Sequence, residues 1–205
     1  MDNRGCCYSN AMETSSRGFT LIELLVTVAL LAIVAVLAGP AFRDLILNNR
    51  QAAQLNEMMA SLNLARAEAV KRGASVRVCI TDGATTPDCS STRTEWELGW
   101  LMVADSNRDG TLSTAGGDTL LQVQEAIGSG TTLRGNNNVT RSVSFNSRGF
   151  SGSTGSTGTL RLCDARGAGE ARGIVIANTG RARRSADSND NGTEEDGSNV
   201  DLACP

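Results

Sequence analysis

Residues 18–42 have the sequence GFTLIELLVTVALLAIVAVLAGPAF, and this stretch decides how the rest of the chain is interpreted. Residues 24–42 carry no charge. At about 1.5 Å per residue, a helix of that length covers most of a hydrocarbon layer about 30 Å thick. A helix in the core of a soluble protein is rarely so uniformly apolar. We therefore expect residues 19–42 to cross a membrane.

The flanking residues predict the orientation of this segment. Arg4 and Arg17 precede the apolar run, which favours a cytoplasmic amino end and an exported remainder. A secretory signal with cleavage near Ala38 is an alternative, but helical sequence follows Pro40 at once.

Glu23 is a single acid beside an apolar span. A carboxylate inside such a span costs about 2.5 to 3.5 kcal/mol on insertion scales unless it is compensated. Because residues 19–42 contain no Lys or Arg, the nearest cation would be an α-amino group at position 19, on this chain or on a neighbour. Pairing between subunits would then recruit each new subunit to a filament. Alternatively, the carboxylate reaches water at the membrane edge.

The sequence Gly-Phe-Thr-Leu-Ile-Glu-Leu-Leu at 18–25 resembles the processing site of type IV prepilins and pseudopilins. The resemblance implies that a prepilin peptidase removes residues 1–18 by cleavage after Gly18 and methylates the amino group of Phe19. Glu23 then becomes the fifth residue. Pro40 lies where many pilins carry a helix-bending proline.

The leader has two possible start codons. Met12 offers a second start codon, which would shorten the leader and exclude Cys6 and Cys7. With either start, these two cysteines precede the cut.

Apolar residues after Pro40 recur in steps of three and four, which predicts an amphipathic helix over residues 43–72. They are Leu55, Met58, Met59, Leu62, Ala65 and Ala69. We expect one helix from about Phe19 to Arg72, ended by Gly73.

From Ser75 onward, short β-prone runs alternate with Gly, Asn and Ser, which is typical of antiparallel sheet. The expected strands are 76–81, 97–104, 119–125, 143–146, 159–163 and 173–177. One helix laid across such a sheet gives an α+β head over residues 73–205, the fold that the pilin resemblance also implies. Trp96 and Trp100 are expected in its core, and the Ser/Thr/Gly run 151–158 at a mobile hairpin tip.

Four cysteines lie in the exported part, where disulfides are expected. Cys79 with Cys89 would close a short loop, and Cys163 with Cys204 would tie the tail to a strand. Four cysteines allow three connectivities. A four-thiolate zinc site is disfavoured because no C-x-x-C pair is present.

Composition argues against an enzyme. The chain has 205 residues, a formal net charge of −3 and no histidine, which excludes serine–histidine triads and histidine-ligated zinc. The charge is divided into blocks: residues 119–184 are basic, and residues 185–205 contain six acids and no base. No cofactor or metal is predicted.

The basic block contains Gly180-Arg181-Ala182-Arg183-Arg184. In an extended strand, Arg181 and Arg183 share one face, about 6.5 to 7 Å apart, which is close to the step between successive phosphates. Guanidinium groups bind phosphate without reading sequence, so DNA is a candidate partner for Arg181, Arg183 and Arg184. Alternatively, the arginines pair with the acidic tail or discourage edge pairing.

Residues 173–183, GIVIANTGRAR, with 76–79, 99–103 and 160–163, resemble the FimT/FimU minor pilins, which are related to the GspH pseudopilins. In FimT-like members a G-R-x-R motif is implicated in DNA binding during natural transformation. Gly180, Arg181 and Arg183 match that motif. FimU-like subunits can carry similar residues.

Two segments, 105–110 and 187–192, fit D-x-[DN]-x-[DN]-G, the first half of a calcium loop. Their twelfth positions are Gly116 and Ser198, where a bidentate Glu should stand. Asx-rich turns explain both segments equally well.

These observations lead to one expectation with two alternatives. The first is a minor type IV pilin in the inner membrane, with a periplasmic head, that assembles with major and minor pilins into or at the tip of a pilus. The alternatives are a DNA-binding minor pilin for DNA uptake and a GspH-like pseudopilin of type II secretion.

Overall fold

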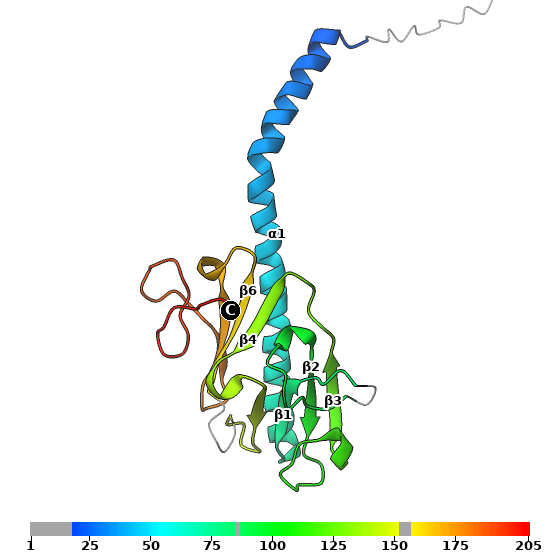
Figure 1. The fold of residues 1–205 in the computed structure, drawn as a ribbon, viewed down its shortest axis with the longest axis vertical. Helices are drawn as coiled ribbons and strands as arrows, with labels where there is room; N and C mark the ends of the chain where they lie inside the picture. Colours follow the sequence, from blue (N-terminus) through cyan, green and yellow to red (C-terminus); the bar gives the residue numbers. More distant parts are fainter. Residues whose placement is uncertain (1–17, 85–86, 152–156) are drawn as a thin grey trace, which may run out of the picture. The chain divides into compact units, whose positions relative to one another are not determined.

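The computed structural model describes residues 18–84, 87–151 and 157–205. The expected leader, apart from Gly18, and most of the expected hairpin tip lie outside these residues. The chain divides into two compact units, Met1–Leu45 and Ile46–Pro205. Their boundary falls inside the helix α1 (Leu21–Arg72). Figure 1 shows that strands and connecting segments make up the second unit after α1.

Helix α1 ends as the sequence predicts, at Arg72. Gly73 has φ +60°, and its N–H donates to the carbonyl of Val70. The N–H of Ala74 donates to the carbonyl of Ala69, which completes a Schellman motif. The glycine therefore ends the helix by accepting a left-handed conformation.

The strands form two four-stranded sheets, and all pairs are antiparallel. The first sheet has the order β3-β2-β1-β5, with strands β1 (Val76–Ile80), β2 (Trp100–Ala104), β3 (Thr119–Gln124) and β5 (Ser142–Phe145). The second has the order β4-β6-β7-β8, with strands β4 (Thr131–Gly135), β6 (Gly158–Asp164), β7 (Arg172–Ile176) and β8 (Ala182–Arg184).

The α+β class is confirmed, but the head has two sheets where one was expected. The strand β4 was not predicted, because its residues are flanked by glycines and carry little β-branched apolar character. The expected strand 97–104 is shorter, since Trp96–Leu98 form a 3-10 turn. Gly99, with φ +104°, separates this turn from β2, and a Cβ there would lie 2.6 Å from the Gln124 carbonyl oxygen.

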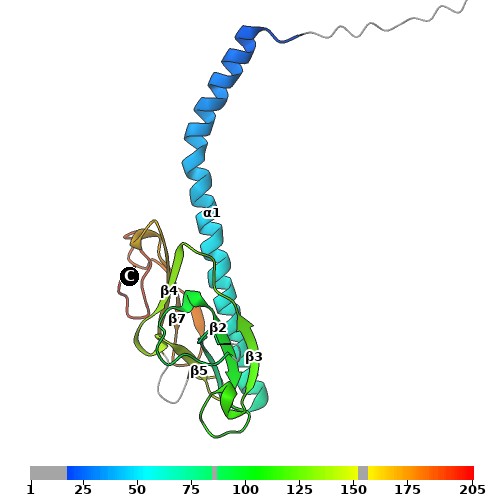
Figure 2. The ribbon, with the colours of Figure 1, turned by 45° about the vertical axis from the view of Figure 1, so that its right-hand side comes forward.

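The core lies between the second half of α1 and the two sheets (Figure 2). Five of the six predicted helix positions are buried, and Met59 packs partly against the same core. Both tryptophans are fully buried, as expected. The indole N–H of Trp100 donates to Ser61 Oγ at 3.0 Å, and that of Trp96 donates to the carbonyl of Thr140 at 3.1 Å.

Two disulfides close the head, Cys79–Cys89 and Cys163–Cys204. These are the two pairings expected from the local loop and the tail. The second spans 41 residues, and in the chain-entropy model such a loop stabilises the fold by about 4 kcal/mol.

Candidate functional site

The first candidate region is the amino end of α1. Gly18 and Phe19 precede the helix and are exposed. The helix begins at Leu21, two residues later than expected, because Thr20 caps it: Thr20 Oγ1 accepts the N–H of Glu23 at 3.3 Å. Thr-x-x-Glu is the capping-box pattern, so the sequence carried this signal although the prediction did not use it.

The apolar half of α1 is exposed along its whole length. An 18-residue window has a mean hydropathy of 2.9 and no buried residue, so by length and composition this helix is able to cross a membrane. Within the described residues, Glu23 forms no ion pair. Pro40 lies inside the helix and lacks the N–H that would bond to the carbonyl of Val36.

The second candidate region is the hairpin that joins β7 to β8. Ala177 accepts the N–H of Gly180 and donates its own N–H to Arg181, which makes a three-residue loop with Gly180 in the left-handed position. A Cβ on Gly180 would lie 2.0 Å from the carbonyl oxygen of Gly149. Glycine is therefore required at position 180 of the G-R-x-R motif for two reasons. Its φ is positive, and a Cβ would collide with the Gly149 carbonyl.

One side chain of helix α1, Arg66, bonds to the loop of this hairpin. Arg66 Nε donates to the Gly149 carbonyl at 2.9 Å, and Arg66 Nη2 donates to the Thr179 carbonyl at 3.1 Å. Ser151 adds a backbone bond to Asn178 and a hydroxyl bond to the carbonyl of Ala177. One guanidinium thus joins the β5–β6 and β7–β8 loops to the helix.

The three candidate arginines, Arg181, Arg183 and Arg184, are all exposed but do not share one environment. Arg184 lies opposite the buried Ile174, and its Nη2 donates to Asn56 Oδ1 on α1 at 2.7 Å. Arg183 lies opposite Val175, on the other face of the sheet. Arg181 precedes β8 in the hairpin. Arg184 therefore contacts the helix, whereas Arg183 lies on the opposite face of the sheet.

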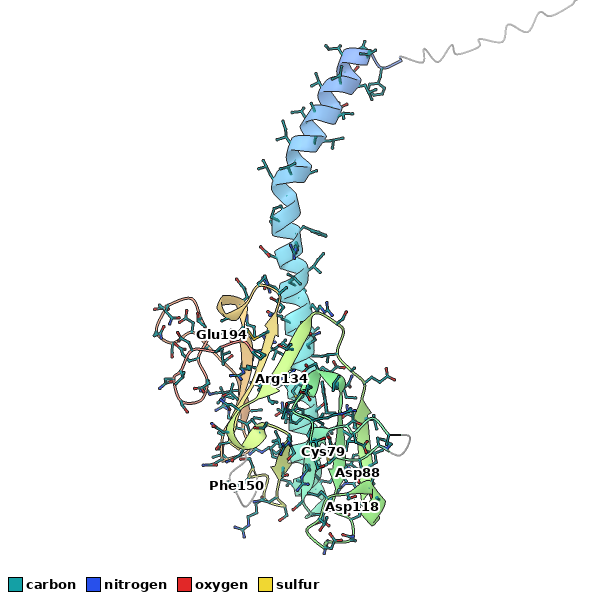
Figure 3. The ribbon with its side chains drawn as sticks, viewed as in Figure 1. Cys79, Asp88, Asp118, Arg134, Phe150 and Glu194 are labelled. Atoms are coloured by element: carbon teal, nitrogen blue, oxygen red, sulfur yellow. A yellow bond between two sulfur atoms is a disulfide. The ribbon has the colours of Figure 1, made fainter. Side chains whose placement is uncertain are left out.

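The acidic tail docks beside the hairpin without pairing with it. Within the part of the chain that the structure describes, Arg181, Arg183 and Arg184 form no ion pair. The tail instead pairs Glu194, which Figure 3 labels, with Arg172 at 2.8 Å. A polar cavity of about 300 Å³, lined in part by Arg183 and Asp196, separates tail and hairpin.

The tail is held by several contacts besides its disulfide. Leu202 is buried against Cys163 and Ala171, and the Gly197 N–H donates to Thr159 Oγ1 at 3.1 Å. Asn136 Nδ2 donates to Asp196 Oδ2 at 3.2 Å. The tail is consequently a fixed cover on one face of the β4-β6-β7-β8 sheet.

Sequence reasoning missed Arg66 and Asn56, because side-chain bonds between a helix and a distant loop follow from tertiary packing. In residues 18–84, 87–151 and 157–205, no three His, Cys, Asp or Glu side chains converge closely enough to hold a metal by themselves.

Comparison with known proteins identifies the family of this chain. Residues 54–180 match the family described as type II transport protein GspH, and residues 14–39 match the prokaryotic N-terminal methylation motif. Two crystal forms of the type IV minor pilin FimU of Pseudomonas aeruginosa are similar at 18% and 16% identity. They cover 68% and 64% of this chain and 90% and 89% of their own, with TM-scores of 0.49 and 0.45. Because the GspH match spans more than half of the sequence, this chain belongs to the GspH family of type IV minor pilins and pseudopilins.

Proposed function

We propose that this chain is a minor type IV pilin that is cleaved between Gly18 and Phe19 and then assembles into, or at the tip of, a type IV pilus. One observation carries the proposal: the exposed apolar half of α1 begins with a single acid, Glu23, that no described cation neutralises. Burial of that helix among other pilins would cover the apolar surface.

Glu23 would give assembly its register. In an apolar surrounding its carboxylate is costly, and the methylated amino group of Phe19 on a neighbouring subunit would compensate it. The helix would first lie in the inner membrane, with residues 73–205 in the periplasm. Other major and minor pilins and the prepilin peptidase would be its partners.

The test combines processing with incorporation. Mass spectrometry of the native protein should find Phe19 as a methylated first residue. Glu23→Gln should retain cleavage and abolish recovery of the subunit in sheared pili, whereas Glu57→Gln, an exposed acid of the same helix, should leave both unchanged. An intact leader, or full incorporation of Glu23→Gln, would contradict the proposal.

A DNA-binding minor pilin is the second candidate, and it is favoured because Arg181 and Arg183 form no ion pair with any described residue. Exposed guanidinium groups on an edge strand suit sequence-independent contacts to phosphate. Such binding would weaken as salt rises.

Full-length protein in detergent, titrated with duplex DNA at two salt concentrations, tests this candidate. Arg181→Ala/Arg183→Ala should lose binding, and Arg108→Ala/Arg141→Ala, which removes two exposed arginines elsewhere, should keep it. Equal binding by both double variants would remove the hairpin as a DNA site.

A pseudopilin of type II secretion is the third candidate. It is favoured because the matching family is described as type II transport protein GspH. Deletion of the gene separates the two assemblies. Loss of surface pili with normal secretion supports the pilus, and loss of secreted enzymes with normal piliation supports the pseudopilus.

A further inference from the structure

The two half calcium loops of the sequence adopt the same conformation. The carboxylate of the first residue accepts the N–H of the sixth, Asp105 from Gly110 at 3.2 Å and Asp187 from Gly192 at 2.8 Å. The fourth residue has a positive φ in each, 61° at Arg108 and 58° at Asp190.

The polar side chains inside the loops repeat as well. Asn107 Oδ1 accepts the N–H of Asp109 at 3.0 Å, and Asn189 Oδ1 accepts that of Asn191 at 3.0 Å. These Asx turns explain how each loop folds. By themselves they do not indicate a ligand.

A separate observation points to a ligand at these loops. Five buried side-chain N or O atoms of the described residues have no hydrogen-bond partner, and two of the five are carboxylate oxygens. They are Asp105 Oδ1 and Glu195 Oε1, on side chains of residues that are only 6% and 4% exposed. A buried carboxylate oxygen without a donor or cation is costly. Asp105 is part of the first loop, and Glu195 is hydrogen-bonded to the second.

One unpartnered oxygen belongs to a residue of the first loop, and the other to a residue that bonds to the second loop. Asp105 is the first residue of one loop, and its other oxygen bonds to Gly110 within it. Glu195 reaches the other loop, because its Oε2 accepts both the N–H of Ser188, at 2.7 Å, and the Ser188 hydroxyl, at 3.0 Å. The unpartnered Oε1 of the same carboxylate therefore lies beside the second residue of that loop.

A further acid from outside each loop contacts it. Asp118 accepts the N–H groups of Ser106 and Ser113, which places a second buried carboxylate beside Asp105; Figure 3 labels it. Asp201 accepts the side-chain amide of Asn191 at 2.9 Å. Neither Asp105 nor Glu195 forms an ion pair within the described residues.

We propose that each loop binds one Ca²⁺ ion, the first through Asp105 and the second through Glu195. The available donors are all oxygens, from carboxylates, Asn side chains and the main chain, which is the mixture that Ca²⁺ accepts with six to eight ligands. Since no three carboxylates of the described residues converge, amide, main-chain and water oxygens complete each shell. Calcium also offsets the charge of residues 185–205, which hold six acids and no base.

The two loops differ in their cationic surroundings. Arg72 and Arg108 line a cavity of about 210 Å³ together with Asp105, whereas the tail loop has no basic residue of its own. The tail site is therefore expected to bind Ca²⁺ more tightly.

The experiment uses full-length protein in detergent, freed of metal by chelator and titrated with CaCl₂ by calorimetry and equilibrium dialysis. Two ions should bind per chain, and the thermal midpoint should rise with Ca²⁺. Asp105→Asn and Glu195→Gln should each reduce the count to one, and the double variant should bind none. Glu57→Gln should still bind two.

Asp118→Asn and Asp201→Asn provide a second variant for each loop if the first set fails to fold in chelator. They should weaken the same ion at least tenfold. No saturable binding, equal binding of Mg²⁺, or two ions retained in both single variants would overturn the proposal. One ion in the wild type, removed by only one variant, would overturn it for the other loop.

Discussion

Arg66 Nη2 donates to the carbonyl oxygen of Thr179, 3.1 Å away and 113 residues later in the chain. The same guanidinium donates through Nε to Gly149 at 2.9 Å. A residue on the helix of the head therefore determines where the Arg181 hairpin lies. The hairpin and the part of α1 that lies in residues 46–72 are one mechanical unit, so changes in either affect how the arginines are presented.

Arg66→Met should destabilise the head by about 1 to 2 kcal/mol, because two carbonyls lose a charged donor while the apolar stem is kept. Urea unfolding followed by tryptophan fluorescence measures the change. Lys71→Met, which removes an exposed i,i+3 ion pair with Glu68, should destabilise the head far less. Equal losses of stability for both variants would show that the Arg66 hydrogen bonds do not hold the hairpin.

Gly180→Ala should cost more than about 2 kcal/mol. Its φ of +74° is strained for alanine, and the new Cβ would meet the Gly149 carbonyl oxygen. Gly167→Ala is the matched control: Gly167 has φ +89°, and a Cβ added there would meet nothing within 4 Å, so only the backbone strain of about 1 kcal/mol remains. Similar unfolding midpoints in urea would show that the contact with Gly149 does not matter.

Much of the fold follows from local pattern. The uniform apolar run, the three-and-four spacing from Leu55 to Ala69, and Gly73 at the helix end are each readable without tertiary information. The division into two sheets is not, because it depends on which distant strands pair. β1 pairs with β5 and β4 pairs with β6, and nothing in the local composition specifies those partners.

Part of the candidate site was also predictable from the sequence. Alternation in an extended strand predicts that Arg181 and Arg183 share one face. The register of β8 opposite β7 begins at Ala182, so it places Arg183 and Arg184 on opposite faces and leaves the face of Arg181 a prediction. The bond from Arg184 to Asn56 was not predictable, and neither was the absence, among the described residues, of ion pairs between the tail and the arginines. The first depends on how β8 packs beside α1, and the second on how the disulfide to Cys204 and the contacts of Leu202 direct the tail.

The pH dependence of stability should include a contribution from Asp164. Burial raises the pKa of this carboxyl, but hydrogen bonds from the Arg166 side chain and backbone outweigh burial, so its pKa lies below the ordinary value of 3.8. A lowered pKa in the folded state stabilises the protein above pH 3.8, and the contribution is lost as the pH falls through the folded-state value.

Asp164→Asn should therefore cost about 1.5 to 3 kcal/mol at pH 7 and progressively less below pH 3.8. Urea unfolding between pH 2 and 7 checks the prediction, with Glu57→Gln as an exposed acid that should follow the wild-type curve. A penalty for Asp164→Asn that stays constant down to pH 2 would show that the Arg166 contact does not hold the carboxylate ionised.

The bond between Trp100 Nε1 and Ser61 Oγ, 3.0 Å long and buried, joins the strand β2 to α1. Ser61→Ala leaves the indole N–H without an acceptor and should cost about 1 to 3 kcal/mol. Trp100→Phe removes the donor together with some packing. Because each single variant breaks the same bond, the double variant should cost less than the two singles combined, with a coupling of about 1 kcal/mol. A double-mutant cycle by urea unfolding measures that coupling, and strictly additive losses would mean that Ser61 contributes packing volume but no hydrogen bond.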